Sequence, residues 1–201
     1  MLSTWNIYAK PLLLTEAKAV YLGHGHQDFP TDELKPFSII ENLWKKGLYQ
    51  GYGFYEKRDA IAGQSDVLRG YAFVMSDPDT GMLLLDYFAI CEEARGQGYG
   101  GKALALLKEA CQEWKGIIFE VEDDESTKVE AEKLLRQKRI SFYEQNGVKM
   151  TKERSSVFGV DYKLMVLPLV KEAEERIEEK LTSIYRKMLP EDVFQTMFRL
   201  R

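Results

Sequence analysis

The feature that most restricts the fold is an apolar segment followed by a glycine-rich loop and then an amphipathic segment. Residues 82–90 read MLLLDYFAI, and a run this apolar is typical of a strand covered on both faces. Residues 95–102 read RGQGYGGK and hold four glycines. After them Ala103, Leu107 and Cys111 recur at helical spacing. This order predicts a buried strand connected by a tight loop to a helix that packs on a sheet.

Further strands are expected on both sides of this segment. Aromatic and β-branched runs, bounded by polar or glycine-containing turns, predict strands at 49–55, 67–75, 117–121, 148–153 and 157–167. Strands and helices do not alternate regularly along the chain. We therefore expect an α/β (α+β) fold with a mixed, mostly antiparallel central sheet of about six or seven strands, flanked by helices.

The helical segments suggest how the chain is organised. Apolar residues at helical spacing predict helices in 12–47 with a turn at Gly23–Pro30, between Thr127 and Gly147, over 170–188 and over 191–200. We expect one domain over residues 1–169 and a C-terminal helical extension over residues 170–201. The apolar stripe of the extension is expected either to pack on the domain or to join two copies in a homodimer.

Composition excludes several classes of protein. The net charge of −4 and the pI of about 5.4 leave no basic block of the kind that nucleic-acid binding needs. An acidic surface instead tolerates or attracts a cationic substrate such as an amine. Two cysteines are too few for a secreted disulfide scaffold, and no apolar run approaches the roughly 20 residues of a membrane span. The N-terminus lacks a signal-peptide pattern, so we expect a cytoplasmic protein without membrane partners.

The glycine-rich loop has the stereochemistry of an anion site. Glycine lacks the Cβ atom that would obstruct a ligand, and it adopts positive φ readily. The free N–H groups of the following helix converge on one point, and the helix dipole adds to their attraction for phosphate. The sequence therefore predicts a phosphate-binding loop.

Two known phosphate motifs fit the loop incompletely. Gly96, Gly98 and Gly101 satisfy the dinucleotide pattern G-x-G-x-x-G, but five residues separate the strand from the first glycine and no further βαβ units follow. The Walker A pattern starts at Gly96, but Ala103 stands where a serine or threonine must bind Mg²⁺. Neither motif is expected to describe the site.

A third pattern fits better. Arg95-x-x-Gly98-x-Gly100 matches R/Q-x-x-G-x-G/A, and the run LLLDYFAICEEARGQGYGGKAL resembles the corresponding strand, loop and helix of the GNAT superfamily of N-acetyltransferases. SFYEQNGVKM at 141–150 is similar to a later element of that family. The resemblance spans roughly residues 50–167, and the helices in 1–47 fit the family's variable, substrate-facing region.

The resemblance implies acetyl-CoA as cosubstrate and no metal. It assigns pyrophosphate binding to the loop, through Arg95, Gln97, Gly98, Tyr99, Gly100, Gly101 and Lys102. It assigns pantetheine binding to the main chain at the end of the strand, at Phe88, Ala89 and Ile90.

The only two histidines of the chain, His24 and His26, could begin a metal site. No third ligand lies nearby in the sequence, so we expect exposed imidazoles on a turn there.

The resemblance also implies direct attack of a primary amine, here expected to belong to a small molecule, on the thioester. Tyr143 matches the family's tyrosine beside the CoA sulfur and is the expected general acid. Asp86 is the expected general base, because an acid within MLLLDYFAI is costly to bury without a purpose. Glu120 and Glu122 on the neighbouring strand are the alternatives, and Asp86 could instead be a satisfied structural carboxylate.

Two departures from the family pattern leave questions open. Arg136 and Arg139 replace the asparagine and alanine that many members carry seven and four residues before the tyrosine. They could contact CoA phosphates or a substrate carboxylate, or form a solvated charged face. The alternative to an active enzyme is a catalytically silent CoA-binding or regulatory module of the same fold.

Overall fold

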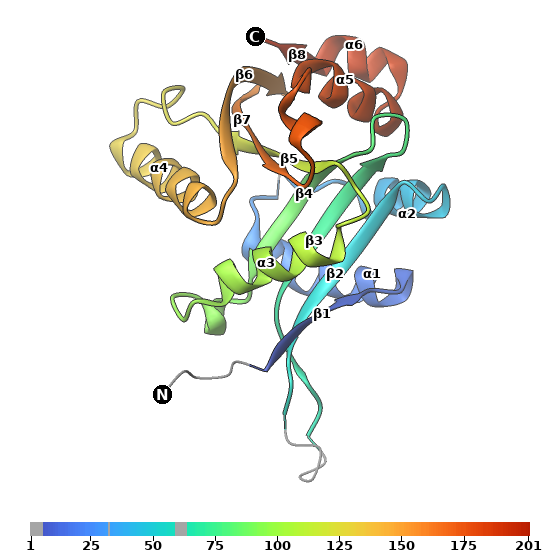
Figure 1. Ribbon diagram of the computed structural model, residues 1–201, viewed down its shortest axis with the longest axis vertical. Helices are drawn as coiled ribbons and strands as arrows, with labels where there is room; N and C mark the ends of the chain where they lie inside the picture. Colours follow the sequence, from blue (N-terminus) through green and yellow to red (C-terminus); the bar gives the residue numbers. More distant parts are fainter. Residues whose placement is uncertain (1–5, 32, 59–63) are drawn as a thin grey trace. The chain divides into compact units, whose positions relative to one another are not determined.

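The structure is a computed structural model that describes residues 6–31, 33–58 and 64–201. Figure 1 shows its elements, which in chain order are β1 (Ile7–Pro11), α1 (Leu14–Asp28), α2 (Phe37–Lys45), β2 (Tyr49–Glu56), β3 (Val67–Asp77), β4 (Met82–Ile90), the 3₁₀ turn η2 (Glu92–Ala94), α3 (Tyr99–Ala110), β5 (Gly116–Glu122), α4 (Glu130–Gln145), β6 (Lys149–Val157), β7 (Val160–Pro168), the 3₁₀ turn η3 (Lys171–Glu174), α5 (Ile177–Met188), α6 (Glu191–Met197) and β8 (Phe198–Leu200). The strand predicted at 82–90 is confirmed as β4.

The sheet is mixed and mostly antiparallel, as the sequence predicts. Its strand order is β1-β2-β3-β4-β5-β7-β6-β8, with β4 and β5 parallel. It has eight strands, however, and the expected six or seven is wrong. The additional strands are β1, which includes Pro11, and the three-residue β8, both at edges of the sheet. Main-chain pairing with β2 and β6 defines these strands, and their own sequences carry little β-periodicity.

The chain divides into two compact units. Unit 1 comprises Met1–Val74 and Asp86–Ala110, and unit 2 comprises Met75–Leu85 and Cys111–Arg201. The boundary in β4 falls where its pairing with β5 ends, at Leu85↔Phe119. The two units are described separately below.

In unit 1, α3 lies in front of the strands and α1 and α2 lie behind them in the view of Figure 1. An aromatic cluster forms the core on the α1 side. The Tyr21 ring meets Phe73 edge-on at 5.8 Å and Tyr87 at 5.4 Å. Rings of this size each bury roughly 150–250 Å² and prefer such edge-to-face contacts. The cluster anchors α1 on β3 and β4.

The predicted turn at Gly23–Pro30 is wrong, because α1 continues through Gly23 and Gly25 to Asp28. Each helical glycine costs about 1 kcal/mol relative to alanine. Burial of residues such as Ala17 and Tyr21 on the same helix outweighs that cost. Pro30 follows the helix end, where the Phe29 N–H bonds to the Gly25 carbonyl at 2.9 Å.

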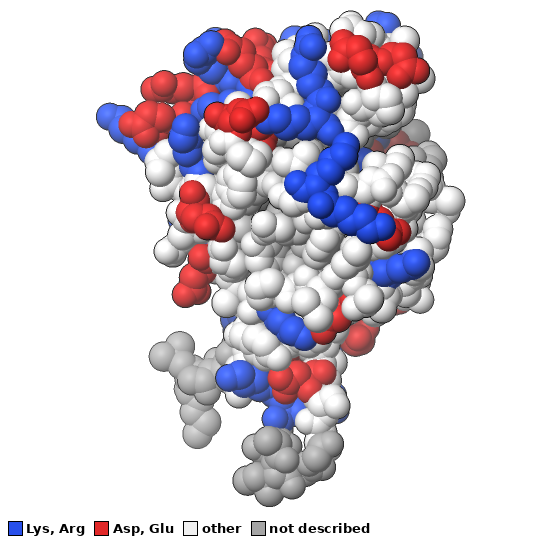
Figure 2. Space-filling model, turned by 90° about the vertical axis from the view of Figure 1, so that its right-hand side faces the viewer, with Lys and Arg blue, Asp and Glu red and all other residues white. Residues whose placement is uncertain are grey.

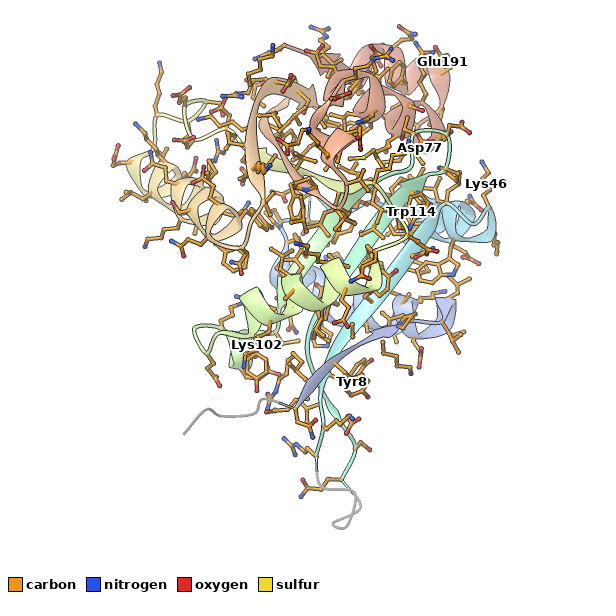
Figure 3. The ribbon with its side chains drawn as sticks, viewed as in Figure 1. Tyr8, Lys46, Asp77, Lys102, Trp114 and Glu191 are labelled. Carbon is orange, nitrogen blue, oxygen red and sulfur yellow. The ribbon has the colours of Figure 1, made fainter. Side chains whose placement is uncertain are left out.

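In unit 2, the C-terminal segment packs into the fold. The stripe Ile177, Leu181 and Ile184 of α5 is buried, and β8 extends the sheet by pairing with β6. Lys187 on α5 forms an ion pair with the fully buried Asp77 at the end of β3, which Figure 3 labels. The helix predicted over 191–200 ends at Met197, and the last part of that range is strand.

Charges of both signs share the surface. On the face shown in Figure 2, acidic and basic side chains lie among uncharged ones, as expected from 28 basic and 32 acidic residues. Among the helices of residues 6–31, 33–58 and 64–201, none is long and apolar enough to cross a membrane.

Candidate functional site

The loop between β4 and α3 has the positive φ values that its glycines permit. Gly96 and Gly98 adopt φ values of 72° and 81°, in the left-handed region. A Cβ atom built on either glycine meets no described atom within 4 Å, so the loop is open to a ligand. Because α3 begins at Tyr99, the loop lies at the positive end of the helix dipole, and Lys102 lies in the first turn of the helix (Figure 3). These features fit a pyrophosphate.

The Arg95 side chain stabilises the start of this loop through two hydrogen bonds. Its Nε donates to the Ile90 carbonyl at 2.9 Å, and its Nη2 binds Asp28 Oδ1 at 2.5 Å. Asp28 is buried and also accepts a hydrogen bond of 2.8 Å from the Tyr71 hydroxyl. The motif arginine therefore ties the loop to the end of α1.

Tyr99 anchors the other end of the loop. Its hydroxyl donates to Glu56 Oε1 at 2.8 Å, and the Arg69 guanidinium binds Glu56 Oε2 at 2.6 Å. These contacts hold the pKa of the Glu56 carboxyl below its usual range, chiefly through Arg69. The first turn of α3 is thus fastened to β2 and β3 within unit 1.

The end of β4 offers main-chain groups along one edge. Pairing between β4 and β5 ends at Leu85↔Phe119, although β4 continues to Ile90. On the other edge, the Cys91 N–H donates to the Arg69 carbonyl of β3 at 3.0 Å. The predicted pantetheine residues Phe88, Ala89 and Ile90 therefore lie beyond the β5 ladder, where an extended ligand can pair with them.

Asp86 has two partners that the sequence does not reveal. Lys35 Nζ donates to Asp86 Oδ1 at 2.5 Å, and the Tyr49 hydroxyl donates to Oδ2. The Asp86 side chain is 8% exposed, and a buried carboxylate of this kind needs such partners. Burial, and then the Asp86 charge, raise the pKa of Tyr49 well above its ordinary value, so Tyr49 is a hydrogen-bond donor here.

The two alternative bases lie in unit 2, also with partners. Ser155 Oγ donates to Glu120 Oε1 at 2.6 Å, and the Tyr185 hydroxyl of α5 donates to Oε2. Glu122 is held by two arginines of α4, with Arg136 at 2.8 Å and Arg139 at 2.9 Å. Arg136 and Arg139 thus form an ion-pair cluster with Glu122, a role that was not among the sequence-based alternatives.

Tyr143 is a buried phenol in unit 2. It is 8% exposed, and its ring lies 5.0 Å from that of Phe119. No residue in the described part of the chain forms a hydrogen bond with its hydroxyl. Burial raises the pKa of Tyr143 to about 12, against a smaller opposing effect of Arg139. The hydroxyl therefore carries its proton at neutral pH and is able to donate it.

This pKa predicts a pH-dependent stability difference between the wild type and Tyr143→Phe. The folded pKa of about 12 lies above the ordinary value of 10.0, so the folded state holds the proton more tightly. The resulting stabilisation is complete below pH 10 and is lost as the pH rises through 12. We expect the unfolding free energy to fall by up to about 3 kcal/mol more in wild type than in Tyr143→Phe over that interval. Urea unfolding at pH 9 and pH 12 measures it; parallel curves would contradict the shift.

The histidine pair lies elsewhere than expected. His24 and His26 are on α1 and not on a turn, and the His24 ring is 6.1 Å from that of Tyr71. Within the described ranges, no cluster of three or more His, Cys, Asp or Glu side chains could hold a metal ion.

The structure thus groups the site residues by unit. Unit 1 holds the loop, the end of β4 and Asp86, and unit 2 holds Tyr143, Glu120 and Glu122. No local motif marks the partners Lys35, Tyr49 and Ser155 in the sequence. Lys35 is separated from Asp86 by 51 residues and Ser155 from Glu120 by 35.

Comparison with known proteins gives the family. A model of the acetyltransferase (GNAT) family matches residues 23–147 of this 201-residue chain. "Putative acetyltransferase YjbC" of Bacillus subtilis (strain 168) is 30% identical over 123 residues, which are 60% of this chain and 52% of YjbC. The chain therefore spans about half the length of this curated relative.

Solved structures share the fold. A putative acetyltransferase of the GNAT family from Bacteroides thetaiotaomicron matches with a TM-score of 0.61 and 19% identity, over 89% of this chain and 98% of that one. Spermidine N-acetyltransferase from Vibrio cholerae, solved with CoA and spermine, matches with a TM-score of 0.56 and 12% identity, over 82% and 96% of the two chains. The family match includes β4, the loop after it and Tyr143, and the chain belongs to the acetyltransferase (GNAT) family.

Proposed function

We propose that this protein transfers an acetyl group from acetyl-CoA to a primary amine of a small molecule. The observation that carries the proposal is the open loop with left-handed Gly96 and Gly98, placed directly before the first turn of α3. A loop of this form binds a diphosphate through main-chain amides, and CoA contains one. The spermidine N-acetyltransferase of similar fold was solved with CoA, which agrees with this choice.

The binding residues would act through their main chain. Amides of residues 97–102 would hold the pyrophosphate, and Lys102 adds a positive charge to the same turn. The backbone of Phe88, Ala89 and Ile90 would pair with pantetheine as an added strand would. An N–H near Ile90 would stabilise the oxyanion of the tetrahedral intermediate. We also propose that the chain forms one domain over residues 1–169 and a C-terminal extension over residues 170–201. Within the domain, residues 1–47 would form the side that binds the acceptor amine.

Proton transfers complete the reaction. Asp86 would take a proton from the acceptor ammonium, and the freed nitrogen would attack the thioester carbonyl carbon. The C–S bond then breaks, and Tyr143 would give its proton to the departing thiolate. The acylated nitrogen would lose its second proton to solvent, which leaves a neutral amide, and solvent would return a proton to Tyr143. The contact between Lys35 Nζ and Asp86 Oδ1 supports Asp86 as the base, because this carboxylate already accepts a hydrogen bond from an alkylammonium group, that of Lys35. Glu120 is the alternative base.

Cys91 supports direct transfer. It directly follows β4 and is buried, and burial raises the pKa of its thiol to about 11. At neutral pH the thiol is almost entirely protonated, and a neutral thiol is a poor nucleophile. An acyl-enzyme on Cys91 is therefore disfavoured relative to attack by the amine.

A second candidate function rests on the ion pairs of the carboxylates. Asp86 is bound by Lys35, and Glu122 by Arg136 and Arg139. If these pairs persist when acetyl-CoA binds, and Glu120 keeps its hydrogen bonds from Ser155 and Tyr185, none of the three carboxylates takes a proton, and the protein is a CoA-binding module without transferase activity.

Release of CoA thiol distinguishes the two functions. The purified protein is incubated with acetyl-CoA and a panel of primary amines, and calorimetry measures acetyl-CoA binding in parallel. The enzyme predicts binding and thiol release that depends on the amine. Binding without release for any amine favours the module, and no binding contradicts both functions.

A further inference from the structure

Two groups of unit 1 contact the ammonium of Lys35, and a third holds the carboxylate that it binds. Its Nζ lies 2.5 Å from Asp86 Oδ1 and 5.1 Å from the centre of the Tyr87 ring. The Tyr49 hydroxyl binds the other Asp86 oxygen. A carboxylate held by a phenol, beside the face of an aromatic ring, is the combination of groups that recognises alkylammonium cations.

The main chain of Lys35 is fixed as well as its side chain. Its N–H donates to the Tyr87 hydroxyl at 3.0 Å, and its carbonyl accepts a hydrogen bond of 2.8 Å from the Tyr21 hydroxyl. The Tyr87 hydroxyl in turn donates to the Glu33 carbonyl at 3.0 Å. The connection between α1 and α2 therefore holds the Lys35 ammonium at Asp86.

The pair differs from the ion pair between Lys187 and Asp77 in the burial of its carboxylate. Asp77, which binds Lys187, is fully buried and also accepts hydrogen bonds from its own turn, including the Thr80 hydroxyl at 2.9 Å. The Lys35 and Lys187 side chains are similarly exposed, at 21% and 26%, but the Asp86 side chain keeps 8% of its surface exposed whereas Asp77 keeps none. Solvent thus reaches both members of the Lys35–Asp86 pair, so the pair is accessible to a dissolved amine.

We propose that Asp86, Tyr49 and Tyr87 form the subsite for the ammonium group of the acceptor, and that Lys35 fills this subsite as an internal ammonium that the acceptor displaces. The proposal rests on the acetyltransferase function proposed above and specifies its substrate class. The acceptor is a primary alkylammonium ion. Anionic acceptors and uncharged aromatic amines are excluded, because neither compensates the Asp86 carboxylate when Lys35 leaves.

A binding experiment tests the subsite without requiring catalysis. Lys35→Ala removes the atoms from Cγ to Nζ, which have the size and charge of propylammonium. Propylammonium is therefore expected to raise the Tm of Lys35→Ala by roughly 3–6 °C for each tenfold increase in concentration above its Kd. Wild type, in which Lys35 competes, is expected to shift much less over the same concentrations. 1-Propanol, which has the same shape without the charge, is expected to have no such effect.

Two variants serve as controls. Lys45→Ala removes a lysine that pairs with Glu41 on the surface of α2, and its Tm is expected not to respond to propylammonium. Lys35→Ala/Asp86→Asn keeps the space but removes the carboxylate, and its response is expected to disappear. Equal Tm shifts in Lys35→Ala and either control, or no shift in Lys35→Ala, would overturn the subsite.

Kinetics with propylamine as acceptor give the second measurement. Removal of an internal competitor is expected to lower the KM for propylamine by about tenfold, with the Kd for acetyl-CoA unchanged. Lys35→Met removes the competing charge but still fills part of the space, so a smaller fall in KM is expected there, and this variant replaces Lys35→Ala should the latter fail to fold. An unchanged or higher KM in an active variant would overturn the proposal. If no protein releases CoA thiol, the acetyltransferase function fails, and the Tm series alone decides the subsite.

Discussion

Gly98→Val is expected to weaken acetyl-CoA binding by about 100-fold or more, equivalent to about 2.7 kcal/mol. Gly98 has φ of 81°, and a residue with a Cβ in that region is strained by about 1–2 kcal/mol. The loop relieves the strain by moving, which misaligns the amides of the first turn of α3. The new side chain also occupies the space that is open beside Gly98, where the pyrophosphate is proposed to lie. Isothermal calorimetry with acetyl-CoA and with free CoA measures the loss.

Gly159→Val is the matched control. Gly159 lies in the turn between β6 and β7 with φ of 85°, and an added Cβ there likewise meets no atom of the described chain within 4 Å. Both substitutions therefore impose similar backbone strain, and both are expected to reduce stability by about 1–2 kcal/mol. Only Gly98→Val is expected to lose acetyl-CoA affinity. Equal affinities in the two variants would show that the loop does not bind the cofactor.

Tyr143→Phe is expected to lower kcat by about 10²–10⁴-fold, the usual contribution of a general acid, with the Kd for acetyl-CoA preserved. The substitution removes one hydroxyl from a buried ring. Because no described group forms a hydrogen bond with that hydroxyl, its loss leaves no protein partner unsatisfied. The unfolding free energy near neutral pH is therefore expected to change by less than about 1 kcal/mol. Steady-state thiol release and urea unfolding at pH 7.5 provide the two measurements.

Tyr52→Phe controls for the loss of a tyrosine hydroxyl elsewhere. Tyr52 lies on β2, and its hydroxyl donates to the Gln50 side chain at 2.9 Å. Its kcat is expected to remain within about twofold of wild type, since Tyr52 belongs neither to the loop nor to the proposed catalytic residues. A comparable loss of kcat in both variants, or no loss in Tyr143→Phe, would show that Tyr143 is not the general acid. The thiolate would then leave without a proton from Tyr143.

The prediction from sequence was most accurate where neighbouring residues determine the structure. The apolar run 82–90 is the strand β4, and the glycines after it adopt the positive φ values that their residue type permits. It was least accurate for α1, where Gly23 and Gly25 signalled a turn. There the packing of Ala17 and Tyr21 against unit 1 outweighs the local preference of two glycines.

The partners of the candidate catalytic residues were beyond sequence analysis. Nothing near Asp86 indicates Lys35, and nothing near Glu120 indicates Tyr185, which lies 65 residues away on α5. Of these partners, Lys35 is the counter-ion of the Asp86 carboxylate, and this ion pair is the basis of the proposed ammonium subsite. A sequence pattern shows that an acid is buried but not which distant group compensates it.

By itself the amino-acid sequence determined the strand–loop–helix unit, the positive φ of its loop glycines and the family. These features depend on residues within about ten positions of one another, where periodicity and glycine conformation are local properties. The tertiary structure alone decided the eighth strand of the sheet, the course of α1 and the ion pairs of Asp86 and Glu122. Each of these depends on groups that only the folded topology brings together, because their free energy comes from burial and long-range pairing.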